Sequence, residues 1–464
     1  MFTLSIMSSA WQKNTVWFLA IVVMSCGSRF QGNSDKALQE AVFRDIMLAD
    51  PSLSHSIALL DDSETSDLAS AFLVDLEEAK ELEDQVKQVL EAKKDPSLDD
   101  RCILWYLENS LISKAFRDHE YPISTTDGLH LDLIRHFQNR EIKSKKQIES
   151  FLGDLLLIDG HIGTLVDELE SMRRDGIIAP DFILEKIRLQ CDSIVKAPID
   201  ENPIYVSFQS NLNDINLLEP TRKAEYLKTC KAKLAERVIP AYVRLSKYLQ
   251  QLEGAGVSIA GVWRLKYGTD YYRNRLKWHT GFDGSIDSLY LSLKAALNEK
   301  QANDAVGLVE SVIESEFPEN TPVFRKVLPV DAHIKGLNLL LALETSGGSA
   351  ADRLAMAKLV VDIGIHSKRW LREQAVDYLI SRTGMNPTIA DEIVIDCIAH
   401  PGLSAAEKLG QLQLVELKKQ LLKKSSSLDF NSFLLEHLKE NGPLPIEVLT
   451  EVLINEAELA QSSL

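Results

Sequence analysis

The sequence predicts an all-α fold, a large multi-helix body that follows an N-terminal export signal. Apolar residues recur at steps of three and four through much of the chain, the spacing of one buried helix face. The sequence has no long stretches of alternating apolar and polar residues, which would indicate strands. No segment repeats with a fixed period, so we expect neither a solenoid nor a propeller.

The composition is that of a globular protein with an acidic surface. The 464 residues suffice for two or three domains, or for one large helical body with a sizeable core. Hydrophobic residues make up 45% of the chain and charged residues 26%. The formal net charge is −17, and acidic proteins are repelled by the phosphates of nucleic acid. We therefore expect no nucleic-acid partner, and a solvated acidic surface is the plainest interpretation of the charge.

Residues 1–25 have the pattern of a signal peptide. They contain one charged side chain, Lys13, followed by an uninterrupted apolar run over residues 16–24. This run is too short to cross a bilayer as a helix, but it matches the apolar core of a signal peptide. Met1 is the start of the leader, or Met7 if the leader is more compact.

The leader ends in Val23-Met24-Ser25-Cys26-Gly27, which resembles a lipobox. In a lipobox a small residue precedes the cysteine that receives acyl chains such as palmitate, so we predict lipidation at Cys26. A plain cleaved signal peptide with an incidental cysteine is the alternative. Residues 26–36 would form a tether to a lipid anchor that contributes roughly 0.8 kcal/mol per buried methylene. Ser28 is not an acidic retention residue, and resemblance to Gram-negative lipoproteins then favours the outer membrane of the cell envelope, facing the periplasm.

The first predicted helix covers residues 68–90, where one face is apolar. Its apolar positions are Leu68, Phe72, Leu76, Ala79, Leu82, Val86 and Leu90. Asp95-Pro96-Ser97 would end this helical region. Later breakers fall at residues 121–128, 197–203, 317–322 and 346–349. Because 317–322 is the clearest linker, we divide the body into an N-terminal helical region, 37–317, and a C-terminal helical region, 318–464.

The C-terminal region has its own helix signals. Ser404-Ala405-Ala406-Glu407 predicts a capping box, in which the serine accepts from a backbone amide and the glutamate reaches back to the cap. Asn441-Gly442-Pro443 predicts the end of a helix, and Pro445 suits the first turn of the next one.

Besides Cys26 the chain has four cysteines, which allow three disulfide pairings. None belongs to a CxxC pair, so no cysteine-based zinc site is indicated. Cys102 and Cys397 lie in apolar helical stretches, which predicts buried free thiols.

Common catalytic motifs are absent from the sequence. None of the ten histidines belongs to His-Glu-x-x-His, so the helix of a standard zinc peptidase is not present. There is no Gly-x-Ser-x-Gly nucleophile elbow and no glycine loop that would hold phosphate. We assign no catalytic residue, no metal ligand and no cofactor from these patterns.

Two clusters combine aromatic and basic residues. In the first, residues 267–280, Tyr272, Arg275 and His279 would share one face of a helix and could hold an acidic group such as a peptide carboxylate. The alternative is that the aromatic rings pack in the core and the bases are solvated. In the second, residues 361–370, His366 follows a glycine and is interpreted as a structural histidine.

At these clusters the chain resembles the bacterial domain of unknown function 885, a group of candidate zinc metallopeptidases. Tyr271-Tyr272-x6-His279-Thr280 with Asp283 is similar to the family's Tyr-Tyr…His-Thr-Thr-Thr-Asp segment. Residues 359–375 are similar to its Val-Val-Asp-Thr-Gly-Ile-His segment, and Pro401-Gly402 with Lys408 and Gly410 follows the same pattern. The resemblance spans roughly residues 40–460 and implies a metallopeptidase-like helical body.

The chain departs from the family at the metal site. Family members carry a His-Glu-Ala-x-Pro-Gly-His-His helix, and its nearest counterpart here is the segment 331–338. If Gly336 aligns with the family glycine, the expected His, Glu and His-His are Asp331, Ala332, Leu337 and Asn338. Zinc hydrolysis needs about three protein ligands and a base, and alanine and leucine supply neither.

The sequence therefore predicts a non-catalytic binding or scaffolding lipoprotein, a pseudo-peptidase whose ligand is a peptide or protein. The candidate vestigial cleft consists of Tyr271, Tyr272, Arg275, His279, His366 and Lys408. A hydrolase with an atypical site is the first alternative. A truncated gene product without a function of its own is the second, and it should lack a cooperative thermal transition.

Overall fold

The computed structural model describes residues 87, 90, 91, 93, 96–114, 116, 121–126, 128–215, 218–254, 259–299, 317, 318, 321, 325, 326, 328–346, 349–424 and 428–462. The predictions for the leader, for Cys26 and for most of the helix at 68–90 lie outside these residues. In the described part the only β pairing is one antiparallel bridge between Ile123 and Gly128. The remaining regular structure is helical, which confirms the predicted all-α fold.

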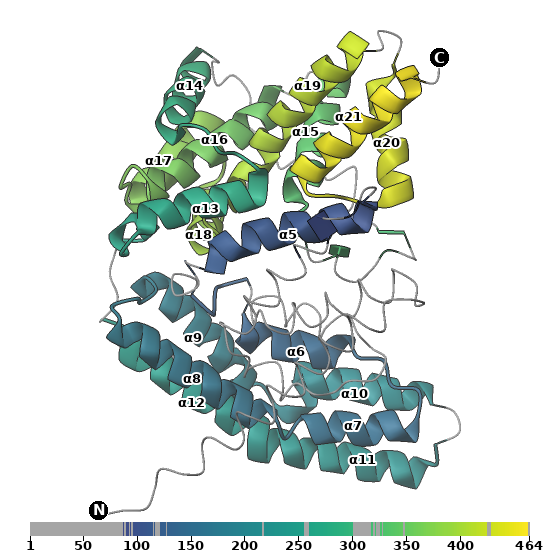
Figure 1. Ribbon diagram of the computed structural model, residues 1–464. Coiled ribbons are helices and arrows are strands. Elements are labelled where there is room, and N and C mark those ends of the chain that lie inside the picture. Colours follow the sequence, from purple (N-terminus) through teal and green to yellow (C-terminus); the bar gives the residue numbers. More distant parts are fainter. Residues whose placement is uncertain are drawn as a thin grey trace, which may run out of the picture.

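The helices form two layers, one above the other in Figure 1. The lower layer contains α6 (Leu129–Asn139), α7 (Lys145–Asp154), α8 (Ile158–Arg174), α9 (Asp181–Lys196), α10 (Pro203–Asp214), α11 (Pro220–Lys233) and α12 (Ile239–Leu252). The upper layer contains α5 (Leu98–Lys114), α13 (Gly268–Thr280), α14 (Ile286–Glu299), α15 (Asp331–Ser346), α16 (Ser349–His366), α17 (Arg372–Thr383), α18 (Pro387–Ala399), α19 (Ala406–Lys424), α20 (Phe430–Asn441) and α21 (Ile446–Ser462).

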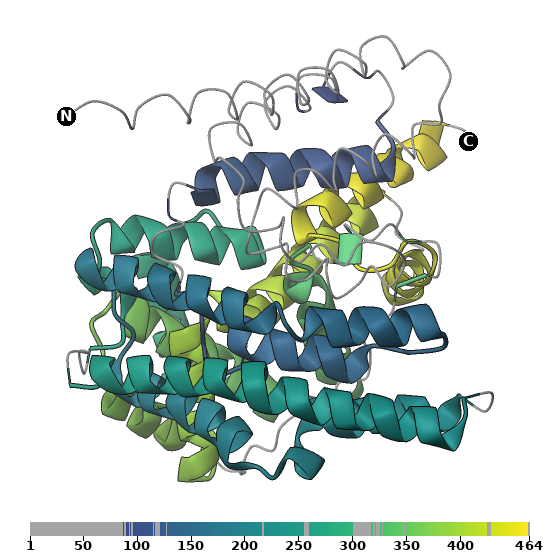
Figure 2. The same ribbon diagram turned by 90° about the horizontal axis from the view of Figure 1, so that it is seen from below.

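Helix α9 illustrates how the apolar spacing creates the lower layer. Its buried residues share one face, where Ile183 and Leu184 are adjacent and steps of three and four lead on to Ile187, Cys191 and Ile194. They face α12, which joins α11 through the π-helical turn Leu234–Val238, so that the three segments form the long rod in Figure 2. The helix begins after Pro180, which cannot donate a backbone hydrogen bond.

Two large apolar cores hold the body together. The first runs through the lower layer and continues into α13, α14 and α16–α18 of the upper layer. The second lies within the upper layer, between α5, α15 and α19–α21, where Trp105 and Trp278 meet with ring centroids 5.4 Å apart. Because one core crosses both layers, the layers are expected to unfold together. The division at residue 317 stays a prediction, since helices from both sides of it contribute to the upper layer.

Several local predictions can be compared with the structure. Gly442 ends α20 as predicted, with a φ of 72° that a side chain would oppose. The capping box at Ser404 and Glu407 is wrong, because Ser404 lies in the 3₁₀ turn Leu403–Ala405 and Glu407 binds the ammonium of Lys358 at 2.7 Å. The four cysteines of the described region are buried and free, as predicted for Cys102 and Cys397.

No helix in the described part of the chain is both long enough and apolar enough to cross a membrane.

Candidate functional site: a basic pocket between the helical layers

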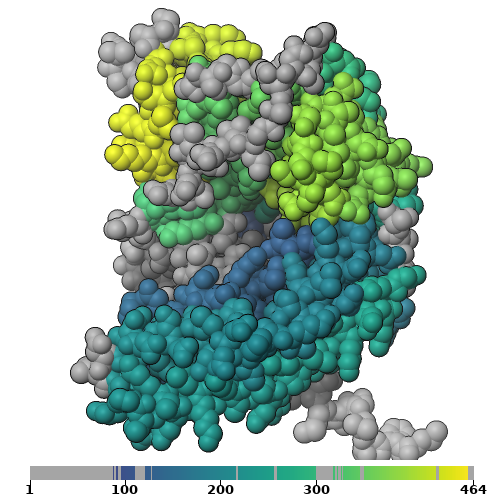
Figure 3. All heavy atoms as spheres, turned by 180° about the vertical axis from the view of Figure 1, so that it is seen from behind, coloured from purple at the N-terminus to yellow at the C-terminus, as the bar shows by residue number. Residues whose placement is uncertain are grey.

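A pocket of about 180 Å³ lies where the two layers meet. Figure 3, seen from behind, shows this junction between the lower layer in blue and teal and the upper layer in green. Five segments form the wall: residues 121–124, 177–183 and 260–265, the first turns of α13, and the end of α18 with the residues after it, 398–401. Most lining side chains are apolar, and the basic members are Arg264, Arg275 and His400.

Arg264 is a cation without an acidic partner among the described residues. Its Nη2 donates to the backbone carbonyl of Ile178, and its Nε is buried with no hydrogen-bond partner in the described structure. Burial lowers the pKa of this guanidinium, and the nearby Tyr121 hydroxyl opposes that shift. A half-buried guanidinium stays charged, so the pocket presents an uncompensated positive charge.

Helix α13 brings a second group of basic residues to the same place. Arg275 lines the pocket, and its Nη2 lies 2.9 Å from Nε2 of His279, one turn further along. Burial, and then the charges of Arg275, His400 and Lys335, hold the pKa of His279 well below its usual value. His279 is therefore neutral at physiological pH, and its Nε2 accepts from Arg275. Of the predicted face of Tyr272, Arg275 and His279, the last two are in contact, and Arg275 lines the pocket.

Tyr272 and His366 lie behind the pocket wall rather than in it. Both are fully buried, and their rings stack with centroids 5.3 Å apart. The backbone N–H of Val262 donates to Nδ1 of His366 at 3.4 Å, so Nε2 donates to the carbonyl of Cys397 at 2.8 Å. Burial lowers the pKa of His366 to about 4. Both nitrogens are thus used within the core, and the histidine is neutral.

A buried carboxyl group connects this core to the wall. Asp362 accepts from the Tyr272 hydroxyl at 2.5 Å and from the backbone N–H of Gly402 at 3.1 and 3.2 Å. Gly402 has a φ of 84° and packs so tightly against α13 that an added Cβ would lie 2.8 Å from the backbone nitrogen of Leu276. Asp362 therefore holds the turn after α18 against the helix that carries Arg275.

Of the two remaining residues of the predicted cleft, one lines the pocket and the other lies elsewhere. Tyr271 lines the pocket, whereas Lys408 on α19 binds Asp352 at 2.5 Å and Gln411 at 2.9 Å. Asp352 and His366 belong to the same helix, α16, and 14 residues of helix separate them by about 20 Å. The structure thus places Tyr271 and Arg275 in the pocket wall, with His279 in contact with Arg275 and with Tyr272 and His366 in the core behind. Lys408 belongs to a separate buried ion pair.

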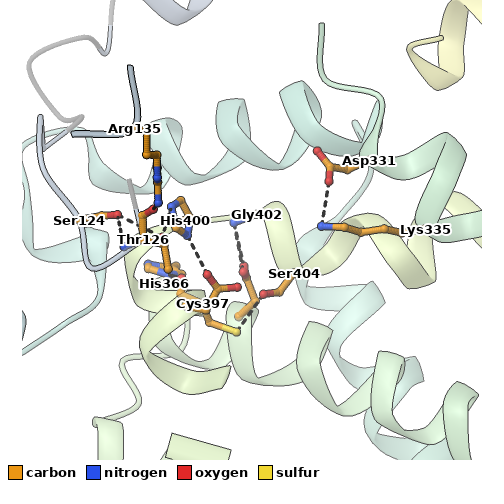
Figure 4. A network of polar contacts seen from close by, with 12 residues as sticks. Ser124, Thr126, Arg135, Asp331, Lys335, His366, Cys397, His400, Gly402 and Ser404 are labelled. Atoms are coloured by element: carbon orange, nitrogen blue, oxygen red, sulfur yellow. Dashed lines mark hydrogen bonds and ion pairs between the residues drawn. The ribbon is translucent and has the colours of Figure 1, made fainter. Parts of the chain in front are cut away.

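The sequence analysis did not single out His400, which lines the pocket, or its contacts Asp396 and Thr126. Nδ1 of His400 lies 3.0 Å from Oδ1 of Asp396. Its Nε2 lies 3.3 Å from Oγ1 of Thr126, and both of these residues are labelled in Figure 4. The spacing of Asp396 and His400, four residues apart at the end of a helix, was a readable signal. Thr126 comes from the loop before α6, and no sequence pattern links it to His400.

The described residues contain no group of three or more His, Cys, Asp or Glu side chains that could hold a metal ion. His333 lies in the second core, where Leu444 donates to its Nδ1 at 3.2 Å, and burial lowers its pKa to about 3. Ala332 and Leu337 of α15 are both buried. Asp331 instead forms an ion pair with Lys335 at 2.8 Å.

Comparisons with solved structures show the same fold in two other proteins. A candidate lipoprotein from Colwellia psychrerythraea aligns with a TM-score of 0.73 and 15% identity, covering 92% of this chain and all of that one. A candidate lipoprotein of unknown function from Shewanella oneidensis aligns with a TM-score of 0.59 and 12% identity, covering 91% of this chain and all of that one. No match is found among curated proteins.

One protein family matches most of the chain. The model of the family described as bacterial protein of unknown function, DUF885, matches residues 53–306 and 342–453, well over half of the sequence. The unmatched segment between them includes residues 331–338. The chain therefore belongs to the DUF885 family of bacterial proteins of unknown function.

Proposed function

We propose that this chain is an exported, lipid-anchored protein that binds a carboxylate-bearing ligand and has no zinc-dependent peptidase activity. The lipobox-like segment at Cys26 supports the anchor, as does the description of both structural neighbours as candidate lipoproteins. The membrane would be the outer membrane of the cell envelope, with the protein facing the periplasm. The dispersed histidines support a pseudo-peptidase, and stoichiometric zinc in the purified protein would contradict that part of the proposal.

The ligand class follows from Arg264. A partly desolvated guanidinium without an acidic partner in the described structure favours an anion, and its planar donors match a carboxylate. Arg275 lines the same pocket from the upper layer, so two guanidinium groups face one small volume. The proposal depends most on one observation: the guanidinium of Arg264 has no acidic partner among the described residues, and its Nε is buried without a hydrogen bond.

The size and lining of the pocket narrow the ligand further. A volume of about 180 Å³ is below the usual size of a pocket for a drug-sized molecule. Ile123, Ile183, Val262 and Ile398 contribute apolar surface next to the two arginines. A short apolar group that ends in a carboxylate fits this combination, and the C-terminal residue of a peptide is the natural example.

The test compares N-acetylleucine with N-acetylleucine amide, using the full lipoprotein in detergent and titration calorimetry. We expect the acid to bind at least about tenfold more tightly than the amide, because only the acid pairs with Arg264. Arg264→Gln should remove this preference. Arg273→Gln is the matched control, since Arg273 is exposed on α13 and pairs with Asp270. Equal binding of acid and amide by the unmodified protein would contradict the proposal.

A hydrolase with an atypical site is the second candidate function, and one observation favours it. Thr126, His400 and Asp396 form a continuous chain of contacts, and His400 lines the ligand pocket.

A further inference from the structure

We propose that Thr126, His400 and Asp396 form a metal-free acyl-transfer site, with Thr126 as the nucleophile. The inference rests on the proposed ligand pocket, because the same pocket would hold the substrate. It goes beyond the binding function by assigning a covalent step to residues that the zinc chemistry of the family resemblance does not involve.

One contact assigns a hydrogen of the imidazole. Nδ1 of His400 faces the carboxylate of Asp396 at 3.0 Å, so this nitrogen carries a hydrogen. In the neutral imidazole Nε2 is then the acceptor nitrogen, and it lies 3.3 Å from the hydroxyl of Thr126. A hydroxyl, an imidazole and a carboxylate in this order are the parts of a nucleophile, a general base and the group that orients the base.

Asp396 is ionised in the folded protein. Burial would raise its pKa, but the hydrogen bond from His400 and the charges of His400, Lys335 and Lys358 outweigh it and hold the pKa below its usual value. An ionised carboxylate next to Nδ1 stabilises the imidazolium that forms when Nε2 takes a proton. Asp396 is therefore a positioning residue, whereas Thr126 and His400 contact the reacting atoms.

The loop that carries Thr126 is anchored on several sides. Arg135 donates through Nη2 to the Thr126 carbonyl at 2.7 Å, and the Thr126 amide donates to Oγ of Ser124 at 3.1 Å (Figure 4). Gln190 of α9 donates to the carbonyl of Thr125 at 2.7 Å. These bonds place an exposed hydroxyl of the lower layer against a histidine of the upper layer, 274 residues away in the sequence.

The substrate class follows from the neighbouring pocket. Ser124 and His400 line it, so a group bound there lies next to the proposed nucleophile. Arg264 and Arg275 provide the positive charge for a carboxylate. We infer that the substrate is an ester of a short acyl group, with a free carboxylate elsewhere in the molecule.

The reaction balances with water as the only co-substrate. Oγ1 of Thr126 attacks the acyl carbon while Nε2 of His400 takes its proton. The bond to the alcohol oxygen breaks, and the alcohol leaves with the proton from His400. Water then attacks the threonine ester, gives a proton to His400 and releases the acid. The proton returns to Thr126, so no oxidant, reductant or metal is consumed.

The test uses two chromogenic esters, 4-acetoxybenzoate and its neutral methyl ester, with the full lipoprotein in detergent. We expect hydrolysis of 4-acetoxybenzoate above background and an acetyl group on Thr126, located by mass spectrometry of the quenched protein. Thr126→Val keeps the shape of the side chain and removes the hydroxyl, so the rate should fall by about 100-fold or more. His400→Gln should have a similar effect.

A matched control and a pH profile separate catalysis from folding. Thr229→Val changes an exposed threonine on α11, whose hydroxyl donates to the carbonyl of Glu225 in the same helix, and it should leave the rate within about twofold. In the unmodified protein the rate should rise with pH as His400 loses its proton, and in Asp396→Asn that rise should shift to lower pH, because the imidazolium has lost its negative neighbour. Arg264→Gln should abolish the preference for the charged ester over the neutral one.

Failure of the inference can be distinguished from failure of the proposed binding function. If the protein binds N-acetylleucine but Thr126→Val hydrolyses the ester at the normal rate, or if no ester is hydrolysed, the acyl-transfer site is excluded and the binding function stands. If hydrolysis depends on Thr126 while acid and amide bind equally, the acyl-transfer site stands and the carboxylate pocket is excluded.

Discussion

Burial in the folded protein raises the pKa of the Asp362 carboxyl group. It is fully buried, and burial raises its pKa from 3.8 to about 7, although the hydrogen bonds from Tyr272 and Gly402 act in the opposite direction. The carboxyl group is therefore partly protonated at neutral pH. Its two hydrogen bonds join α13, α16 and the turn after α18, so its charge affects the packing behind the ligand pocket.

This shift predicts a pH dependence of stability. The folded protein binds the proton more tightly than the unfolded chain, so the free energy of unfolding should fall as pH rises from about 4 to about 7 and then level off. In Asp362→Asn, which cannot ionise, this contribution should disappear, with a difference on the order of a few kcal/mol between the two ends of the range. Urea denaturation at about pH 5 and about pH 8 measures it.

The control for this prediction is Asp270→Asn, since Asp270 is exposed and pairs with Arg273 on the same helix. That variant should keep the pH dependence of the unmodified protein. If Asp362→Asn keeps it too, the titrating group lies elsewhere.

At the residue scale, the sequence predicted contacts between residues of one helix well. It predicted contacts between residues far apart in the sequence poorly. Arg275 and His279 are four residues apart, and helix geometry alone brings them within 2.9 Å. Tyr272 lies on the same helix, but its place in the core depends on Asp362 and His366, 90 or more residues later. Thr126 and His400 could not be paired from sequence, because only the facing layers bring them together.

At the level of elements, the contact between α15 and α19 shows how closely the segment 331–338 is packed. An added Cβ on Gly410 would lie 1.9 Å from the carbonyl oxygen of Ala332, and one on Gly336 would lie 2.4 Å from the backbone of Gly410. The two helices thus touch almost backbone to backbone. Positions where the family resemblance expects metal-site residues are used here for packing.

Gly410→Ala should therefore be strongly destabilising. The methyl group cannot be accommodated without separating α15 from α19, and we expect a loss of about 1–3 kcal/mol or more in the free energy of unfolding. Gly160→Ala is the matched control, because Gly160 is exposed on α8 and has nothing near its Cβ position. That change should stabilise the protein by about 0.5–1 kcal/mol, as alanine favours helix. Thermal unfolding of both variants measures the difference, and equal behaviour would contradict the backbone contact.

The end of α20 was predicted correctly, because the local backbone conformation determines it. Gly442 ends α20 because its positive φ suits glycine. The capping box at Ser404 failed because tertiary partners compete for both side chains: Ser404 contacts the thiol of Cys397 at 3.0 Å, and Glu407 pairs with Lys358. Pattern reasoning has no access to such partners.

At the scale of the whole molecule, the apolar spacing predicted the all-α fold, whereas the pocket required the arrangement of the layers. The first core includes residues from Ile123 to Leu409, so the lower layer and much of the upper layer share one interior. The pocket wall takes residues from five separate segments, and only two of its side chains, Tyr271 and Arg275, belonged to the predicted cleft. A site made from so many segments depends on packing that local periodicity does not encode.

The anchor can be tested on the intact lipoprotein in a Gram-negative host. Lipidation of Cys26 should determine whether the protein is attached to a membrane, whereas Ser28 should determine which of the two membranes holds it. One acyl chain binds a membrane only marginally, whereas several together hold a protein there stably. Cys26→Ser should therefore release the protein from the membrane fraction. Cys102→Ser, which alters a buried thiol in α5, should leave it bound. Ser28→Asp should keep the lipid but move the protein from the outer to the inner membrane, as density-gradient fractionation would show. If Cys26→Ser remains with the membrane, a surface of the folded body holds it there, and neither the anchor nor the tether over residues 26–36 is needed to explain its location.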